Sequence, residues 1–176
     1  MDTPWLDRRQ LRAWLCLRGV LELLPGLLDA QLRRDADLTE FDYYVLAMLS
    51  EAPGRTLRIT ELARQTNATL PRLSHVVSRL EGRGLTERSP CPDDRRATDV
   101  RLTEAGWATV QDAAPGHVAN VRQLVVDALS DEQVDQLAGI ADAILARLDP
   151  TGSMAAAYTR YDDVPEPREQ QQTAAG

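Results

Sequence analysis

The stretch from Thr60 to Thr103 constrains the fold of this chain more than any other part of its sequence. Two short helical runs begin directly after Thr60 and Thr69, and threonine is a preferred N-cap residue. The first run covers about 61–66 and is broken at Asn67, and the second covers about 70–82. Two extended segments follow. The order of helix, turn, helix and hairpin predicts a winged helix-turn-helix in a chain that is otherwise mainly α.

The second helical run has two faces of different character. Leu70, Leu73, Val77 and Leu80 recur every three or four residues, so they share one stripe that we expect to face a core. The opposite face is polar and positively charged, and its side chains are of the kind that fits the major groove of DNA. It carries Pro71, His75, Ser78 and Gly82, with Arg72 and Arg79 on its flanks.

A β-hairpin follows, with strands predicted at 85–88 and 98–102 and a third short strand at about 56–59. The connection at 89–97 is rich in proline and aspartate, which do not continue either strand. Its tip, Asp93-Asp94-Arg95-Arg96, could place an arginine in a minor groove while an aspartate orients it. Such a tip could also be a solvated loop, but its position after a helix-turn-helix favours a DNA-binding wing.

Charge is divided unevenly along the chain. The whole sequence has 27 acidic and 20 basic residues, and its formal net charge is −7. Between Arg55 and Arg101, however, ten arginines stand against six acidic residues, so this segment carries +4 and the remainder carries −11. The predicted DNA-reading unit is therefore the basic part of an acidic chain.

Helices with apolar seams flank this unit. Thr39 caps a predicted helix at 40–50, Thr103 caps one that bends at Pro115, and Ser130 with Gln133 forms a capping box for the last one. The N-terminal helix, at about 7–34, has a narrow seam of residues spaced by three and four: Trp14, Leu17, Leu21, Leu24 and Leu28.

Seams without a partner in the chain indicate a dimer interface, although the same helices could pack on their own domain. We therefore expect a helical dimerisation region at 1–36 and 104–149 and a DNA-binding winged helix-turn-helix domain at 37–103. A homodimer would place two recognition helices about one DNA turn apart, which predicts a palindromic operator in double-stranded DNA. The tail at 150–176 is rich in Thr, Gly, Pro and Gln, so we expect it to be disordered.

Other classes of protein find little support in the sequence. No run of apolar residues is long enough to span a membrane and no cleavable signal is apparent, so we expect a cytoplasmic protein without a membrane partner. Cys16 and Cys91 form neither a disulfide framework nor a CxxC pattern, and the two histidines, His75 and His117, are isolated. We therefore expect no metal site and no cofactor. Motifs of nucleotide-binding or hydrolytic enzymes are missing, which argues against an enzyme.

Several motifs in combination resemble the MarR family of bacterial transcription regulators. They are Ile59-Thr-Glu-Leu-Ala63, Leu80-Glu-Gly-Arg-Gly-Leu85, Asp94-Arg-Arg96 and Val100-Arg-Leu-Thr-Glu-Ala-Gly106. The resemblance extends over roughly 5–148. It implies a dimer of winged-helix subunits that usually represses a nearby operon and is often released from DNA by a small aromatic or phenolic molecule.

Carried over by position, the resemblance implies that helix 70–83 enters the major groove and that wing 89–97 reaches the minor groove through Asp94, Arg95 and Arg96. Pro71 departs from the family pattern, because proline lacks the N–H that could hold a phosphate, so anchoring would rest more on neighbouring side chains. The candidate recognition residues are Thr69, Pro71, Arg72, Ser74, His75, Ser78 and Arg79.

The resemblance also implies an effector pocket between the dimerisation helices and the winged helix, bounded by Trp14, Leu17, Tyr43 and Tyr44. Ordinary core packing is the simpler interpretation of each of these four residues. A redox switch through Cys16 or Cys91 is an alternative: we expect Cys16 to be buried among apolar neighbours and Cys91 to be more exposed in the wing. A second alternative is a winged-helix protein-interaction module, against which the arginines of the wing argue.

Overall fold

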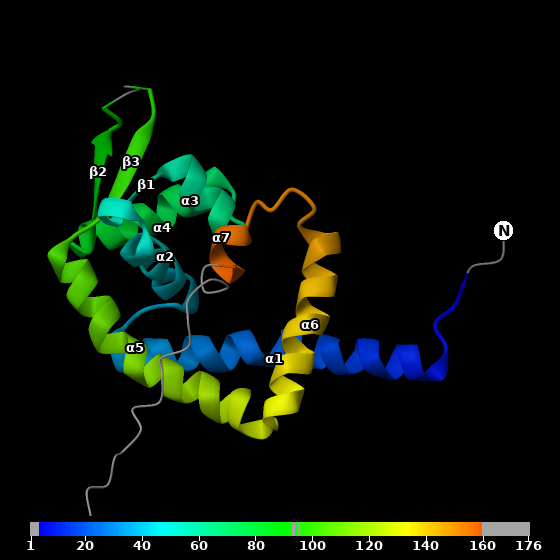
Figure 1. The fold of residues 1–176 in the computed structure, drawn as a ribbon. Coiled ribbons are helices and arrows are strands. Elements are labelled where there is room, and N and C mark those ends of the chain that lie inside the picture. The colour runs from blue at the N-terminus through cyan, green and yellow to red at the C-terminus, as the bar shows by residue number, and fades with distance from the viewer. Residues whose placement is uncertain (1–3, 93, 95, 160–176) are drawn as a thin grey trace, which may run out of the picture.

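The structure, a computed structural model, describes residues 4–92, 94 and 96–159. Within these residues the fold is mainly helical with one small sheet, as predicted (Figure 1). The elements in chain order are α1 (Arg8–Ala36), α2 (Glu40–Glu51), the 3-10 turn η1 (Pro53–Arg55), β1 (Thr56–Arg58), α3 (Ile59–Gln65), α4 (Leu70–Gly82), β2 (Thr86–Pro90), β3 (Thr98–Leu102), α5 (Glu104–Leu124), the 3-10 turn η2 (Val126–Ala128), α6 (Asp131–Leu148) and α7 (Ala155–Tyr158).

The sheet of the described residues is antiparallel, with strand order β1-β3-β2. Thr56 pairs with Arg101 of β3, and Thr86 pairs with Leu102 of the same strand. The third strand, predicted at 56–59, is therefore present as β1. The strand predicted at 85–88 begins one residue later, as β2, because the Leu85 N–H donates to the Leu80 carbonyl at the end of α4 (3.0 Å) and pairing with β3 starts at Thr86.

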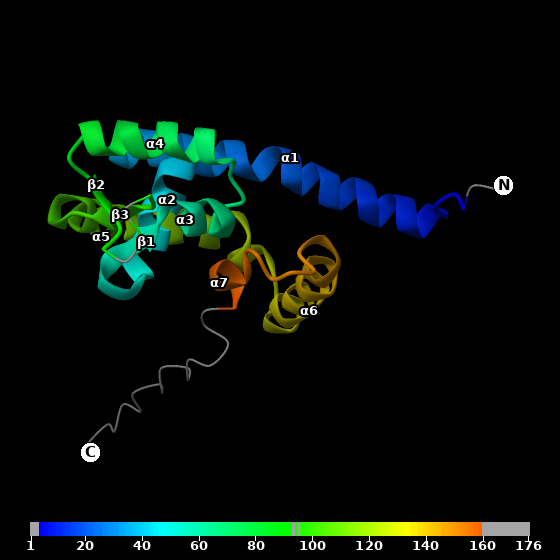
Figure 2. The same ribbon diagram turned by 90° about the horizontal axis from the view of Figure 1, so that it is seen from above.

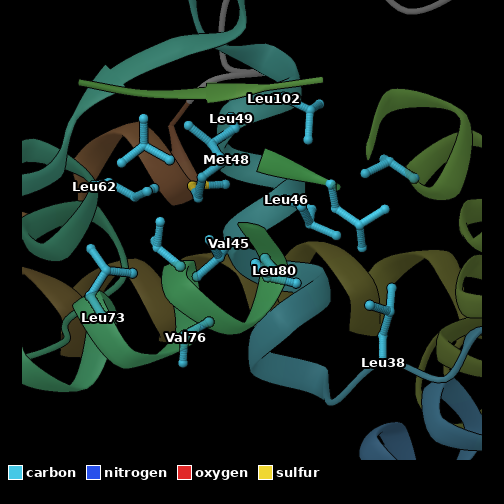
Figure 3. Packing of buried hydrophobic residues seen from close by; sticks show 14 of the residues in the cluster. Leu38, Val45, Leu46, Met48, Leu49, Leu62, Leu73, Val76, Leu80 and Leu102 are labelled. Atoms are coloured by element: carbon cyan, nitrogen blue, oxygen red, sulfur yellow. The ribbon is translucent and has the colours of Figure 1, made fainter. Parts of the chain in front are cut away.

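One apolar core joins α2, α3, α4 and the sheet (Figure 3). Leu73, Val77 and Leu80 of α4 are fully buried in it, as their spacing predicts. The prediction for Leu70 is wrong: it is 45% exposed, because it is the first residue of α4 and lies one turn before the first buried residue of the helix, Leu73. Val76 takes its place in the buried stripe.

Most helices begin where their capping residues predict. Thr39 and Asp42 form a reciprocal capping box at α2, and Ser130 and Gln133 form one at α6. The expected cap at Thr60 is wrong: α3 begins at Ile59, and Arg58 occupies the N-cap without a side-chain hydrogen bond. The reason is that β1 leads into the helix without an intervening turn.

The two terminal helices extend beyond this core. The N-terminal half of α1 projects away from the winged helix, while its C-terminal half packs against α5 (Figure 1). α6 turns back toward the winged helix after η2. Figure 2 shows α4 along one edge of the molecule, with α6 and α7 on the other side. No helix in the described part of the chain has the length and apolar content needed to cross a membrane.

The beginning of the tail differs from the prediction of disorder at 150–176. Residues up to Thr159 are described, and Ala155–Tyr158 form α7, which packs against α3. The ordering comes from Asp149, whose carboxylate binds residues 153, 154 and 158, a long-range effect that composition does not reveal. The remainder of the tail, 160–176, lies outside the described residues.

Candidate nucleic-acid interface

The exposed face of α4 is polar and positively charged. All seven residues expected to contact DNA from this helix are exposed: Thr69, Pro71, Arg72, Ser74, His75, Ser78 and Arg79. Thr69 occupies the N-cap as predicted, although its side chain makes no capping hydrogen bond, and Pro71 lies in the first turn. This face has no acidic residue in its first turn, which leaves the positive N-terminal end of the helix dipole uncompensated.

Two arginines of this face are held by α2. Arg79 forms an ion pair with Asp42, whose side chain is only 3% exposed. Asp42 also accepts a hydrogen bond from the Thr39 backbone N–H (3.0 Å), so one carboxylate both caps α2 and positions an arginine of α4. The Arg72 guanidinium lies 4.2 Å from the centre of the Phe41 ring. Both guanidiniums are therefore preorganised rather than extended freely into solvent.

Arg88 of β2 is a component of this surface that the sequence analysis missed. Its guanidinium donates to the Ser74 carbonyl (2.7 Å), the Ser78 hydroxyl (2.9 Å) and a Glu81 carboxylate oxygen (3.0 Å). It thereby joins the wing to three turns of the recognition helix. The alternation of side chains along β2 could have indicated this contact. Thr86 is buried against α4, and Arg88, two residues later, lies on the same side of the strand.

The wing is closed by a network of backbone hydrogen bonds. The Cys91 N–H donates to the Ala97 carbonyl (3.0 Å), and the Ala97 N–H donates to the Asp94 carbonyl (2.8 Å). The Asp94 carboxylate accepts from the Arg96 backbone N–H (3.0 Å), so it fixes the backbone of Arg96. Asp94 and Arg96 are exposed, whereas Arg95 lies outside the described residues.

Both expectations for the cysteines are wrong in the single chain. Cys91 is buried, and the Arg58 guanidinium donates to its sulfur atom (3.2 Å). Cys16 is exposed, because its apolar neighbours on α1 themselves face outward in the projecting half of the helix. The apolar neighbours of Cys16 in the sequence therefore did not indicate that Cys16 is buried within one subunit.

The structure does not gather the four expected effector residues around one cavity. Trp14 and Leu17 are exposed on the projecting half of α1, while Tyr43 and Tyr44 are half-buried on α2. The Tyr44 hydroxyl donates to the Gln65 carbonyl (3.2 Å), and the Tyr43 ring lies 4.7 Å from that of His117. Burial lowers the pKa of His117 below its ordinary value of 6.5.

A cavity of about 860 Å³ lies instead between α1, α2 and α4. Arg72, His75 and Arg79 line it from the recognition helix. Asp29 lines it from α1, and Arg33 and the Glu40 backbone N–H, which donate to this carboxylate, hold its pKa below the usual range. Burial raises the pKa of Glu40, which also lines the cavity. Among the described residues no cluster of three or more His, Cys, Asp or Glu could hold a metal ion.

Comparisons with known proteins agree with this geometry. The sequence profile of the MarR family matches residues 38–98. The structure is similar to that of Sco3205, a MarR family transcriptional regulator from Streptomyces coelicolor in complex with DNA, with 39% identity, a TM-score of 0.82, and 85% of this chain and 94% of that chain covered. AbsC, another MarR family regulator from the same organism, is 36% identical with a TM-score of 0.80, over 85% of this chain and 100% of that chain. The HTH-type transcriptional repressor YetL of Bacillus subtilis is 27% identical over 139 residues, which are 74% of this chain and 83% of YetL.

Proposed function

Since this chain belongs to the MarR family of transcription regulators, which are not enzymes, we propose that it is a homodimeric repressor of a specific operator. The exposed face of α4, flanked by the wing, is the observation that carries the proposal. In this arrangement α4 enters the major groove and Arg96 reaches the adjacent minor groove. The site of action is DNA, so cytoplasmic localisation is part of the proposal.

Exposed apolar side chains on the terminal helices support the homodimer. Contiguous apolar surface of this kind is unfavourable in water and marks an interaction site. Every residue of α6 is at least partly exposed to solvent in the described chain. A second copy would cover large apolar side chains on both helices: Leu11, Trp14, Leu15, Val20, Leu21, Leu23 and Leu27 of α1, and Val134, Leu137, Ile140 and Ile144 of α6.

The cavity of about 860 Å³ supports release by a small molecule. It combines two guanidiniums, of Arg72 and Arg79, with the imidazole of His75 and the aromatic ring of Phe41. The guanidiniums can bind an anionic group of an aromatic ligand through charge-assisted hydrogen bonds, while Asp29 and Glu40, which also line the cavity, favour polar or donor groups on the same ligand. A ligand in this cavity would bind the same arginines that the proposed DNA-binding face uses, so ligand binding would oppose operator binding. The pocket expected around Trp14, Leu17, Tyr43 and Tyr44 stays a second candidate for the effector site.

A fluorescence-anisotropy titration tests the DNA-binding proposal. The protein is titrated against its own upstream DNA and against a scrambled duplex, at two salt concentrations. We expect a salt-sensitive preference for the upstream fragment, and we expect Arg96→Ala to weaken that binding by about tenfold or more because a groove contact is lost. Arg122→Ala is the control, since Arg122 is an exposed arginine at the end of α5, which lies away from the wing in Figure 1.

Equal, salt-insensitive affinity for both duplexes, with no effect of Arg96→Ala, would contradict the repressor proposal. That result would favour the winged-helix protein-interaction module. Sedimentation of the same protein at micromolar concentration tests the homodimer separately from its DNA binding.

A further inference from the structure

α6 is an arm with little support from the rest of its own chain. None of its residues is buried in the described structure, and its N-terminal end is joined to α5 through η2. Its other end returns to the winged helix and continues into residues 149–159, here called the hook, which include α7 (Figure 1). The hook lies against α3, the first helix of the helix-turn-helix. The arm is therefore held at both ends, by α5 through η2 and by the winged helix through the hook.

The Asp149 carboxylate organises the hook. One of its oxygens accepts from the Ser153 backbone N–H and hydroxyl, both at 2.7 Å. The other accepts from the Met154 N–H (2.7 Å) and the Tyr158 hydroxyl (3.0 Å). The hydroxyl and backbone donors around it lower the pKa of Asp149 to about 2. The carboxylate is therefore ionised at neutral pH, and the turn that it closes includes Gly152 with φ +64.

Arg64 of α3 binds the backbone of the hook. Its guanidinium donates to the carbonyls of Ser153 (2.6 Å) and Gly152 (3.3 Å). Glu61, one turn earlier, accepts two further hydrogen bonds from the same guanidinium, at 2.5 and 2.9 Å, which fix its plane. Ala157 of α7 packs at the edge of the main core. The attachment thus combines charge-assisted hydrogen bonds with apolar packing.

α3 transmits this attachment to the recognition helix. The turn between the two helices is closed by the Ala68 N–H, which donates to the Ala63 carbonyl (2.9 Å), and Leu62 and Leu73 are buried together in the core. A displacement of α3 therefore displaces α4 as well. In a dimer built on the arms, the hook would hold each recognition helix at a fixed angle to its arm.

We propose that the hook is a tether that fixes the orientation of the helix-turn-helix relative to α6 and thereby sets the half-site spacing that the dimer accepts. The inference rests on the proposed homodimer. One base pair changes the separation of half-sites by about 3.4 Å along the DNA and also rotates one half-site about the axis. A dimer whose helix-turn-helix units are fixed to α6 resists such a change in spacing. Without the tether, each helix-turn-helix could rotate relative to α6 about η2 and adapt to the new spacing.

Operators with altered spacing test the tether. Duplexes carry the two half-sites at the natural separation or with one or two base pairs added, and dissociation constants are measured for the full-length dimer. We expect wild type to discriminate against two added base pairs by about tenfold or more, and Asp149→Ala to reduce that ratio to about threefold or less. Asp135→Ala, an exposed aspartate earlier on the same helix, should keep the wild-type ratio.

Amide hydrogen exchange and sedimentation accompany the titrations. Asp149→Ala should speed exchange at Ser153 and Met154 without dissociating the dimer, and Tyr158→Phe should give the same changes to a smaller extent, since it removes one of four hydrogen bonds. Tyr158→Phe also provides the test if Asp149→Ala does not fold. Wild-type discrimination in a variant whose hook exchanges freely would overturn the tether, as would unchanged exchange in Asp149→Ala. A monomeric wild type would instead refute the homodimer, and the tether with it.

Discussion

Replacing Gly106 by alanine should destabilise the protein strongly, although both residues are small. Gly106 lies in the first turn of α5, where Thr103 caps its N–H (3.0 Å). A Cβ atom added there would meet the Leu85 carbonyl oxygen at 2.1 Å and the Leu102 Cδ1 atom at 2.6 Å, whereas ordinary contact begins at 3.4 Å. The Leu85 oxygen belongs to the backbone and cannot rotate away, so α5 and the turn that leads into β2 must separate by about 1 Å or more.

The cost follows from what this separation breaks. Overpacking of this kind costs about 1–3 kcal/mol. The Leu85 carbonyl also accepts the Thr103 N–H at 3.1 Å, and losing that hydrogen bond adds about 1 kcal/mol. We therefore expect Gly106→Ala to lower the free energy of unfolding by about 3 kcal/mol and Tm by about 10 °C.

Urea unfolding followed by circular dichroism, at one fixed protein concentration, measures this change. Gly82→Ala is the matched control, because Gly82 is also helical and an added Cβ would meet nothing within 4 Å. Alanine has the higher helix propensity, so the control should be neutral or stabilised by up to about 1 kcal/mol. A Gly106→Ala protein within about 0.5 kcal/mol of wild type would refute the argument from the close approach.

Two further predictions concern polar side chains, Asp42 of α2 and His117 of α5. Asp42→Ala removes the capping bond to Thr39 and the ion pair to Arg79, so the free energy of unfolding measured in urea should fall by about 2 kcal/mol; a fall below about 0.5 kcal/mol would show that the pair contributes little. Burial lowers the pKa of His117 in the folded state below 6.5, so its stabilising contribution is present above that pH and is lost as the pH falls through 6.5 toward the folded-state pKa. His117→Phe should therefore lose less stability than wild type between pH 7 and 5, and identical pH profiles in thermal unfolding would contradict this.

Local signals predicted the parts of the fold that depend on neighbouring residues in the chain. Thr39 and Ser130 begin helices as capping residues do, and the spacing of Leu73, Val77 and Leu80 located the buried stripe of α4. Such features require only a few residues in the correct order. The same signals located the polar face of α4, which carries Pro71, His75 and Ser78.

Contacts between distant segments were not predictable in this way. Arg88 reaches Ser78 from another element, and Arg64 binds carbonyls nearly ninety residues later in the chain. Nothing in the local sequence distinguishes Asp149, at the end of α6, whose four hydrogen bonds exist only because the chain turns back on itself. The exposure of Cys16 likewise depends on where the projecting half of α1 lies, and only the three-dimensional arrangement gives that.

The cavity beside α4 imposes a thermodynamic condition on the proposed repressor. Arg72, His75 and Arg79 line this cavity and also belong to the face proposed to read DNA. A ligand that binds through these groups must lower the affinity for the operator by the same factor by which the operator lowers the affinity for the ligand. A fivefold weakening of DNA binding by saturating ligand therefore requires about fivefold weaker ligand binding to the DNA complex. A ligand that occupies the cavity without weakening operator binding must therefore bind without using these arginines.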